Sequence, residues 1–230
     1  MTVVMLIDDH RLFSASLAAA LRSQAFEVET PALTSLDQVG AQLVQSHPDV
    51  AIIDRDLGGL GSGEPLIDVA AQARVPAVVV TGALDDVVAG RCYARGAAAC
   101  LSKLEPLEEL LAIVTSVAGG VPSVADLERF RLIDAWRHWQ ASVDAATGPF
   151  SQLTPREAAV LRYVMDGRSV KTIAASSGVS EATVRSQVRS ILSKLGASSQ
   201  LEAVAMALRA GWPQSAHQRG SMGQGGAPWS

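Results

Sequence analysis

Short apolar runs that alternate with amphipathic stretches constrain the fold of this chain more than any other feature of its sequence. Uninterrupted apolar runs such as VVML and VAIID are typical of strands that are buried on both faces of a parallel sheet. Five such runs occur in the first half, at residues 3–7, 26–30, 50–53, 77–80 and 97–101. Helical stretches lie between and after them, at roughly 11–24, 35–46, 63–74, 84–95 and 106–118. Five strand-and-helix repeats predict a doubly wound, flavodoxin-like α/β domain over residues 1–118.

The charge of the chain is divided between its two halves. Acidic side chains outnumber basic ones by about two to one over residues 1–118, and the ratio is reversed over residues 151–211. We therefore expect only the C-terminal part to bind a polyanion. No apolar run approaches the ~20 residues of a membrane-spanning helix, and Asp8 and Asp9 interrupt the first apolar run before it could serve as a signal segment. These features predict a cytoplasmic protein.

Residues that interrupt helices divide the rest of the chain. The sequence GGVP at 119–122 follows the first domain, and residues 124–145 then predict a helix that TGP at 147–149 ends. We therefore assign residues 119–150 to a linker and residues 151–211 to a second, all-helical domain. Residues 212–230 are rich in glycine, serine, glutamine and proline, which predicts a disordered tail.

Polar side chains gather where the predicted strands end: Asp8, Asp9, Asp54, Thr81 and Lys103. The carboxyl ends of parallel strands meet at one edge of a sheet, where α/β domains bind ligands. Three carboxylates at that edge repel one another unless a cation neutralises them, and Mg²⁺ is the simplest hard divalent cation with oxygen ligands. The alternative is that each acid only caps a loop, which accounts for a single aspartate more readily than for five suitable residues together.

This arrangement suits the transfer of a phosphoryl group onto a carboxylate. Asp54 would attack the incoming phosphoryl group. The metal ion and Lys103 would neutralise charge on the transferring oxygens, and Thr81 would donate its hydroxyl to a new phosphoryl oxygen.

Four segments resemble the receiver domain of response regulators in their order and spacing: IDDH at 7–10, IIDRDLGG at 52–59, VVVTGA at 78–83 and LSKLEP at 101–106. The resemblance implies that Asp54 is the phosphoacceptor and that a histidine kinase is the donor. It also implies that Asp8 and Asp9 help to hold Mg²⁺ and that the backbone carbonyl of Asp56 completes the metal site. Two positions depart from the family pattern, since Gly58 replaces a common proline and Cys100 replaces a frequent aromatic switch residue.

Complete helix-end signals define four helices in the C-terminal segment. The sequence TPRE at 154–157 combines an N-cap, a first-turn proline and a capping-box glutamate, and Ser169, Ser180 and Ser199 begin three further helices. Residues 170–195 match a helix-turn-helix, whose second helix enters the major groove of DNA. One face of that helix carries an apolar stripe, and the other face carries Arg185, Ser186, Arg189 and Ser190.

Several polar residues of this segment are candidate DNA contacts. Arg185 and Arg189, one turn apart, can reach guanine edges or phosphates, and the alternative is an ordinary solvated helix face. Candidate phosphate contacts are Lys171, Thr172 and Lys194. Residues 153–204 closely resemble the LuxR-type helix-turn-helix, so the whole chain resembles the NarL/FixJ class of response regulators. That resemblance implies that Arg185, Ser186 and Arg189 read bases and that the helix over 199–210 mediates dimerisation.

We therefore predict a dimeric transcription regulator, not an enzyme, that is phosphorylated on Asp54 and then binds double-stranded promoter DNA. One alternative is a regulator of the same build that responds to a ligand or protein contact without phosphorylation. A second is a haloacid-dehalogenase-like phosphatase, with Asp54 and Asp56 as its DxD motif. That motif normally opens the first strand of its domain, whereas this DxD follows the third predicted strand, and it normally has Thr or Val where this chain has Gly58.

Overall fold

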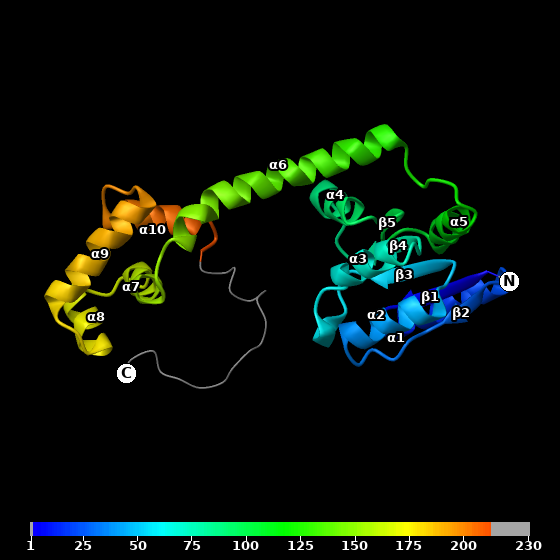
Figure 1. Ribbon diagram of the computed structural model, residues 1–230, viewed down its shortest axis with the longest axis horizontal. Coiled ribbons are helices and arrows are strands. Elements are labelled where there is room, and N and C mark those ends of the chain that lie inside the picture. The colour runs from blue at the N-terminus through cyan, green and yellow to red at the C-terminus, as the bar shows by residue number, and fades with distance from the viewer. Residues whose placement is uncertain (1, 213–230) are drawn as a thin grey trace. The chain divides into compact units, whose positions relative to one another are not determined.

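The five apolar runs of the first half form one parallel sheet in the computed structural model, which describes residues 2–212 (Figure 1). The strands are β1 (Val3–Ile7), β2 (Glu27–Glu29), β3 (Val50–Asp54), β4 (Ala77–Thr81) and β5 (Ala99–Ser102). Their order across the sheet is β2-β1-β3-β4-β5, and every neighbouring pair is parallel. Every residue of β3 and β4 is buried, because both faces of these central strands are covered. The predicted doubly wound fold is confirmed.

Helices cover both faces of this sheet. They are α1 (Arg11–Ser23), α2 (Leu36–Ser46), α3 (Glu64–Gln72), α4 (Asp86–Ala94) and α5 (Leu107–Ala118), with a short 3-10 turn, η1, at Gly58–Leu60. Successive side chains of a strand point to opposite faces. Val4 and Leu6 of β1 therefore pack with α1 and α5, whereas Met5 and Ile7 pack with α2, α3 and α4. The chain changes direction across the sheet between β1 and β3, and α/β sheets bind ligands at the carboxyl ends of the strands at such a point.

A single long helix, α6 (Asp126–Ser151), follows the sheet domain. The prediction that TGP at 147–149 ends this helix is wrong, because the helix continues through Pro149 to Ser151. A proline removes one backbone donor, and this loss falls in the last turn, where few hydrogen bonds depend on it. The next residue, Phe150, is buried in the core of the C-terminal unit and holds that turn in place. The chain divides into two units after Trp139, within α6.

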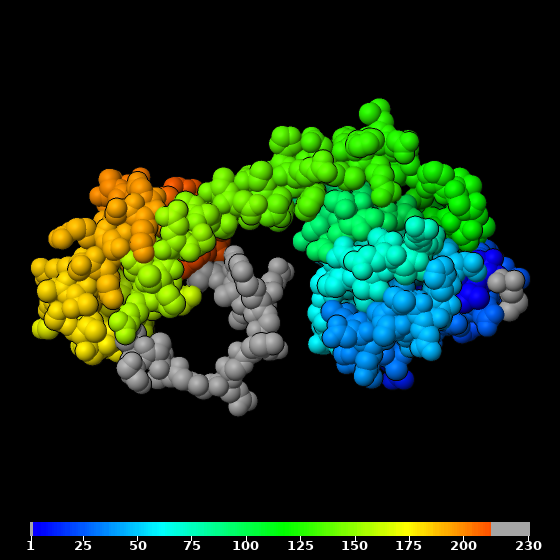
Figure 2. Space-filling view, viewed as in Figure 1, coloured from blue at the N-terminus to red at the C-terminus, as the bar shows by residue number. Residues whose placement is uncertain are grey.

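The first part of α6 packs on α4 within the N-terminal unit, and the surfaces of the two helices adjoin (Figure 2). A Cβ atom on Gly90 of α4 would overlap the carbonyl oxygen of Leu132 and would lie 2.9 Å from the Cβ of Trp136. The missing side chain therefore lets the two backbones come into contact. Leu132 itself is buried in the core that lies beneath α4.

Polar contacts flank this close approach. Arg131 of α6 forms an ion pair with Asp86 at 2.9 Å. The guanidinium of Arg129 lies over the ring of Tyr93, 5.1 Å from its centroid, and donates to the Tyr93 carbonyl oxygen at 3.3 Å. The contacts fix the position of α6 along α4 at both sides of Gly90.

The C-terminal unit is helical. It contains α7 (Pro155–Met165), α8 (Val170–Ser177), α9 (Glu181–Leu195) and α10 (Gln200–Arg209). The side chains of Thr154, Ser169, Ser180 and Ser199 cap these helices, so the predicted helix starts are confirmed. The predicted disordered tail, apart from Trp212, lies outside the described residues. Across residues 2–212, no helix is long and apolar enough to cross a membrane.

The replacement Gly90→Ala tests the contact between α4 and α6. Alanine favours a helix over glycine, but its methyl group would collide with the backbone of α6, so we expect a net loss of about 1–3 kcal/mol of unfolding free energy. The matched control is Gly40→Ala in α2, whose Cβ would meet its nearest neighbours at an ordinary 3.6 Å. That variant should gain up to about 1 kcal/mol. Urea unfolding of the full chain measures both, and equal effects would contradict a backbone contact at Gly90.

Candidate functional site

A lysine and two buried carboxylates meet at the carboxyl edge of the sheet. The ammonium group of Lys103, which follows β5, lies 2.6 Å from Oδ2 of Asp54 and 2.7 Å from Oδ2 of Asp8. Asp54 ends β3 and is 1% exposed, and Asp8 directly follows β1. The backbone N–H of Asp56 donates to Oδ1 of Asp54 at 3.0 Å, which fixes the orientation of the Asp54 carboxylate.

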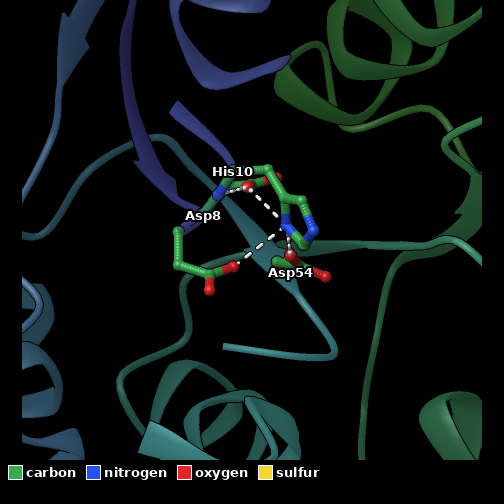
Figure 3. Close-up of side chains that lie close together, drawn as sticks. Asp8, His10 and Asp54 are labelled. Atoms are coloured by element: carbon green, nitrogen blue, oxygen red, sulfur yellow. Dashed lines mark hydrogen bonds and ion pairs between the residues drawn. The ribbon is translucent and has the colours of Figure 1, made fainter. Parts of the chain in front are cut away.

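The imidazole of His10 lies over the same carboxylates (Figure 3). Its Nδ1 is 3.0 Å from Asp9, 3.2 Å from Asp54 and 3.5 Å from Asp8. Sequence reasoning gave His10 no role, although it directly follows the two acidic residues. Within the described residues, Asp8, Asp9, His10 and Asp54 form the group whose ligand atoms lie within 4.8 Å of one another and could hold a metal ion.

Burial affects the ionisation of this group. The pKa of the Asp8 carboxyl is raised by burial and by the neighbouring charge of Asp54, against the opposing effect of Lys103 and the N–H of His10. Keeping Asp8 ionised where water is excluded therefore costs free energy. A bound cation would relieve that cost, since an opposite charge favours the ionised carboxylate.

The loop after β3 explains why glycine stands where the family often has proline. Gly58 has a φ of +53°, and its N–H donates to Oδ1 of Asp56 at 3.1 Å. Proline allows neither feature, because its ring holds φ near −65° and it has no N–H. A Cβ at Gly58 would also overlap Oδ2 of Asp9. The glycine-rich loop therefore lies directly against the acidic group, while the carboxylate of Asp56 points to the loop.

Thr81, the last residue of β4, is 2% exposed, and its hydroxyl hydrogen-bonds to Arg55 and Ala83. Its hydroxyl accepts a hydrogen bond from Nε of Arg55 at 3.1 Å. The same hydroxyl donates to the carbonyl oxygen of Ala83 and accepts from the Ala83 N–H, both at 3.3 Å. Sequence reasoning placed Thr81 at the right edge of the sheet but missed Arg55, whose contact is 26 residues distant in sequence.

The predicted DNA-reading face is exposed on α8 and α9. Arg185, Ser186 and Arg189 of α9 point to solvent, while Val184, Val188, Ile191 and Leu195 are buried in the core of the unit. Arg185 forms an ion pair with Glu181 one turn earlier, at 3.1 Å. Lys171 and Thr172 are exposed in the first turn of α8. The exposed row is therefore polar and basic, as a DNA-reading helix requires.

Comparison with known proteins agrees with this architecture. The family model of the response regulator receiver domain matches residues 4–115, and that of the luxR family of bacterial regulatory proteins matches residues 151–207. The transcriptional regulatory protein LiaR of Bacillus subtilis is 28% identical over 208 residues, which cover 90% of this chain and 96% of LiaR. The transcription regulator BvgA of Bordetella pertussis is 30% identical over 213 residues, which cover 90% of this chain and 96% of BvgA. The chain belongs to the NarL/FixJ class of response regulators.

A solved LuxR-family response regulator from Aurantimonas sp. resembles this chain in fold alone. It covers 60% of this chain and 99% of its own length, with 18% identity and a TM-score of 0.50. As a member of the NarL/FixJ class, this regulator combines a receiver domain with a LuxR-type DNA-binding domain, and it acts on transcription.

In this response regulator, Glu157 ties α7 to α9. Its carboxylate closes the predicted capping box with Thr154. It also accepts from the Ser190 hydroxyl and pairs with the Lys194 ammonium, each at 2.6 Å. Ser190 therefore contacts α7. The prediction that Ser190 lies on the polar face with Arg185 and Arg189 is wrong. Lys194 remains a predicted phosphate contact, but its charge is already paired. No local sequence signal links Glu157 to partners 33 and 37 residues away.

The Glu157 network makes the stability of the C-terminal unit dependent on pH. Burial opposes ionisation, but hydrogen bonds from Lys194, Ser190 and Thr154 prevail and lower the pKa of Glu157 from an ordinary 4.5 to about 2. The ionised carboxyl therefore contributes stability above pH 4.5, and that contribution is lost as the pH falls toward 2.

We expect Glu157→Gln to destabilise the unit by about 1–3 kcal/mol at pH 7 and by progressively less as the pH falls from 5 to 2. Hydrogen exchange of the amides of α7 and α9 in the full chain measures this loss. The control is Glu202→Gln in α10, an exposed carboxylate that accepts from the N–H and the hydroxyl of Ser198, and it should have a smaller effect. A pH-independent loss in Glu157→Gln would show that the charge of Glu157 is not the cause.

Proposed function

We propose that this response regulator is activated when a histidine kinase transfers a phosphoryl group to Asp54, and that the activated protein binds promoter DNA as a dimer in the cytoplasm. The observation that carries this proposal is the pairing of a buried nucleophilic carboxylate, Asp54, with Lys103 at 2.6 Å beside a second buried carboxylate. A structural ion pair would need one aspartate, whereas this site holds a surplus of negative charge at an open sheet edge.

Mg²⁺ fits the donor set of the site. The side chains of Asp8, Asp9 and Asp54 offer the hard oxygen ligands that this ion prefers, and the backbone carbonyl of Asp56 lies on the adjoining loop. When bound, Mg²⁺ would neutralise charge on phosphoryl oxygens and align the donor with Asp54.

The side chains of the chain have separate roles in the transfer. An oxygen of Asp54 attacks phosphorus, so that an acyl–phosphate P–O bond forms while the P–N bond to the donor imidazole breaks. The ammonium of Lys103, already between Asp54 and Asp8, neutralises the transferred oxygens. The hydroxyl of Thr81 turns from Ala83 and donates to a phosphoryl oxygen.

The C-terminal unit supplies the DNA contacts and the dimer. In this proposal Arg185, Ser186 and Arg189 read base edges, while Lys171, Thr172 and Lys194 contact phosphates. Dimerisation would use α10, where Leu201 is 80% exposed and Leu208 is 66% exposed. Large apolar side chains on one exposed helix favour contact with a second copy.

Phosphorylation can be tested with acetyl phosphate as a small donor. We expect intact mass measurement to show an acid-labile adduct on the wild-type chain with Mg²⁺, and none after chelation of the metal. Asp54→Asn should form no adduct, because it removes the nucleophile. Asp56→Asn should retain the adduct, because Asp56 contributes its backbone in this proposal.

Other outcomes would favour the alternatives. A wild-type chain without adduct would support control by ligand or protein contact. Continuous release of phosphate from a generic ester, abolished in both Asp54→Asn and Asp56→Asn, would support the phosphatase.

Base reading by Arg189 is tested with an operator that is selected in vitro by the phosphorylated protein. We expect Arg189→Ala to weaken binding to that operator by about 1–3 kcal/mol and to weaken binding to random DNA of equal length far less. The control, Lys171→Ala, should weaken both to the same degree, since a phosphate contact carries no sequence information. Equal losses in Arg189→Ala would make Arg189 a phosphate contact.

A further inference from the structure

A chain of charged contacts leads from the acidic site to α4, and Arg55 is its first member. Arg55 directly follows Asp54, and its Nε donates to the hydroxyl of Thr81 at 3.1 Å. The other end of the same guanidinium, Nη1, lies 3.9 Å from Oε1 of Glu64 at the start of α3. The planar guanidinium of Arg55 thus contacts both the Thr81 hydroxyl and the Glu64 carboxylate, which the forked geometry of arginine permits.

Glu64 is the centre of this network. It is 6% exposed, and buried carboxylates are tolerated only when they are paired. Arg91 of α4 holds its Oε1 at 2.6 Å, and Arg95 approaches Oε2 at 3.6 Å while it also pairs with Asp68. Arg55 and Arg91 therefore share one carboxylate oxygen, with Arg91 much the closer of the two. The Nε of Arg91 is buried and has no hydrogen-bond partner in the part of the chain that the structure describes.

The position of α4 depends on Arg91 on one side and on α6 on the other. Arg91 is next to Gly90, at which the backbone of α6 rests on α4. A change in the ion pair between Glu64 and Arg91 would therefore alter the contact between Gly90 of α4 and Leu132 of α6. By comparison, Cys100 of β5 packs against the core cluster that contains Cys92 of α4, and it carries no ring that could report on Thr81.

We infer that Arg55 is a positioning residue for Thr81 and that it couples the state of Asp54 to α4 and α6 through Glu64. This inference rests on the proposed phosphorylation. When the Thr81 side chain rotates to bring its hydroxyl oxygen to the phosphoryl group, that oxygen moves away from Nε of Arg55, and Arg55 loses its acceptor. Its guanidinium then moves closer to Oε1 of Glu64 and competes with Arg91. The weakened hold on Arg91 loosens α4 and the first part of α6.

Hydrogen exchange of the full chain, with and without acetyl phosphate and Mg²⁺, tests this coupling. We expect phosphorylation of the wild type to speed amide exchange in α4 and over residues 126–139. In Arg55→Met, which keeps the stem without the guanidinium, this response should shrink about tenfold, as expected from one charge-assisted hydrogen bond. Glu64→Gln should also reduce it. Responses are compared at equal adduct occupancy from intact mass.

Two further variants separate coupling from general disturbance of the network. The matched control is Arg95→Ala, which removes contacts to Glu64 and Asp68 without touching Thr81, and it should respond as the wild type does. Arg55→Lys should restore part of the response, since lysine keeps the charge but cannot hold Thr81 and Glu64 at once.

The outcomes distinguish this inference from the phosphorylation on which it rests. A wild-type chain that forms no adduct overturns both proposals. An adduct together with a full exchange response in Arg55→Met overturns the role of Arg55 alone. An equal loss in Arg95→Ala, or slower exchange in the phosphorylated wild type, also overturns it.

Discussion

The repulsion between Asp8 and Asp54, held in check by Lys103, is the interaction on which the N-terminal unit depends. Both carboxylates are buried, and each lies within 2.7 Å of the same ammonium group. Only a parallel sheet brings the ends of β1, β3 and β5 to one edge, and only helices on both faces bury those ends. The fold therefore brings negative charges together where water screens them poorly. This unscreened charge makes the site sensitive to an added metal ion or phosphoryl group.

Features with a local cause were predictable from the sequence. The strands follow from uninterrupted apolar runs, and the helix starts follow from capping residues such as Thr154. The edge that carries Asp54, Thr81 and Lys103 follows from the rule that parallel strands end together.

Features that depend on distant contacts were not predictable in this way. Pro149 stays within α6 because Phe150 is buried by residues that come later in the chain. Ser190 turns inward because Glu157 offers an acceptor 33 residues away. The contact of Arg55 with Thr81 joins two strand ends whose side-chain directions the sequence does not specify. In each case the local pattern allowed several outcomes, and tertiary packing selected one.

The contact at Gly90 limits how this regulator could be recombined with others. At Gly90 the α6 helix meets α4 through main-chain atoms, so the fit requires the absence of a side chain at that position, in addition to the flanking contacts of Arg129 and Arg131. A chimera that joins this linker and output domain to a foreign receiver would need glycine at the equivalent position of its fourth helix. Residues of α6 that do not contact α4, by contrast, could change in evolution without altering how the helix packs on the receiver.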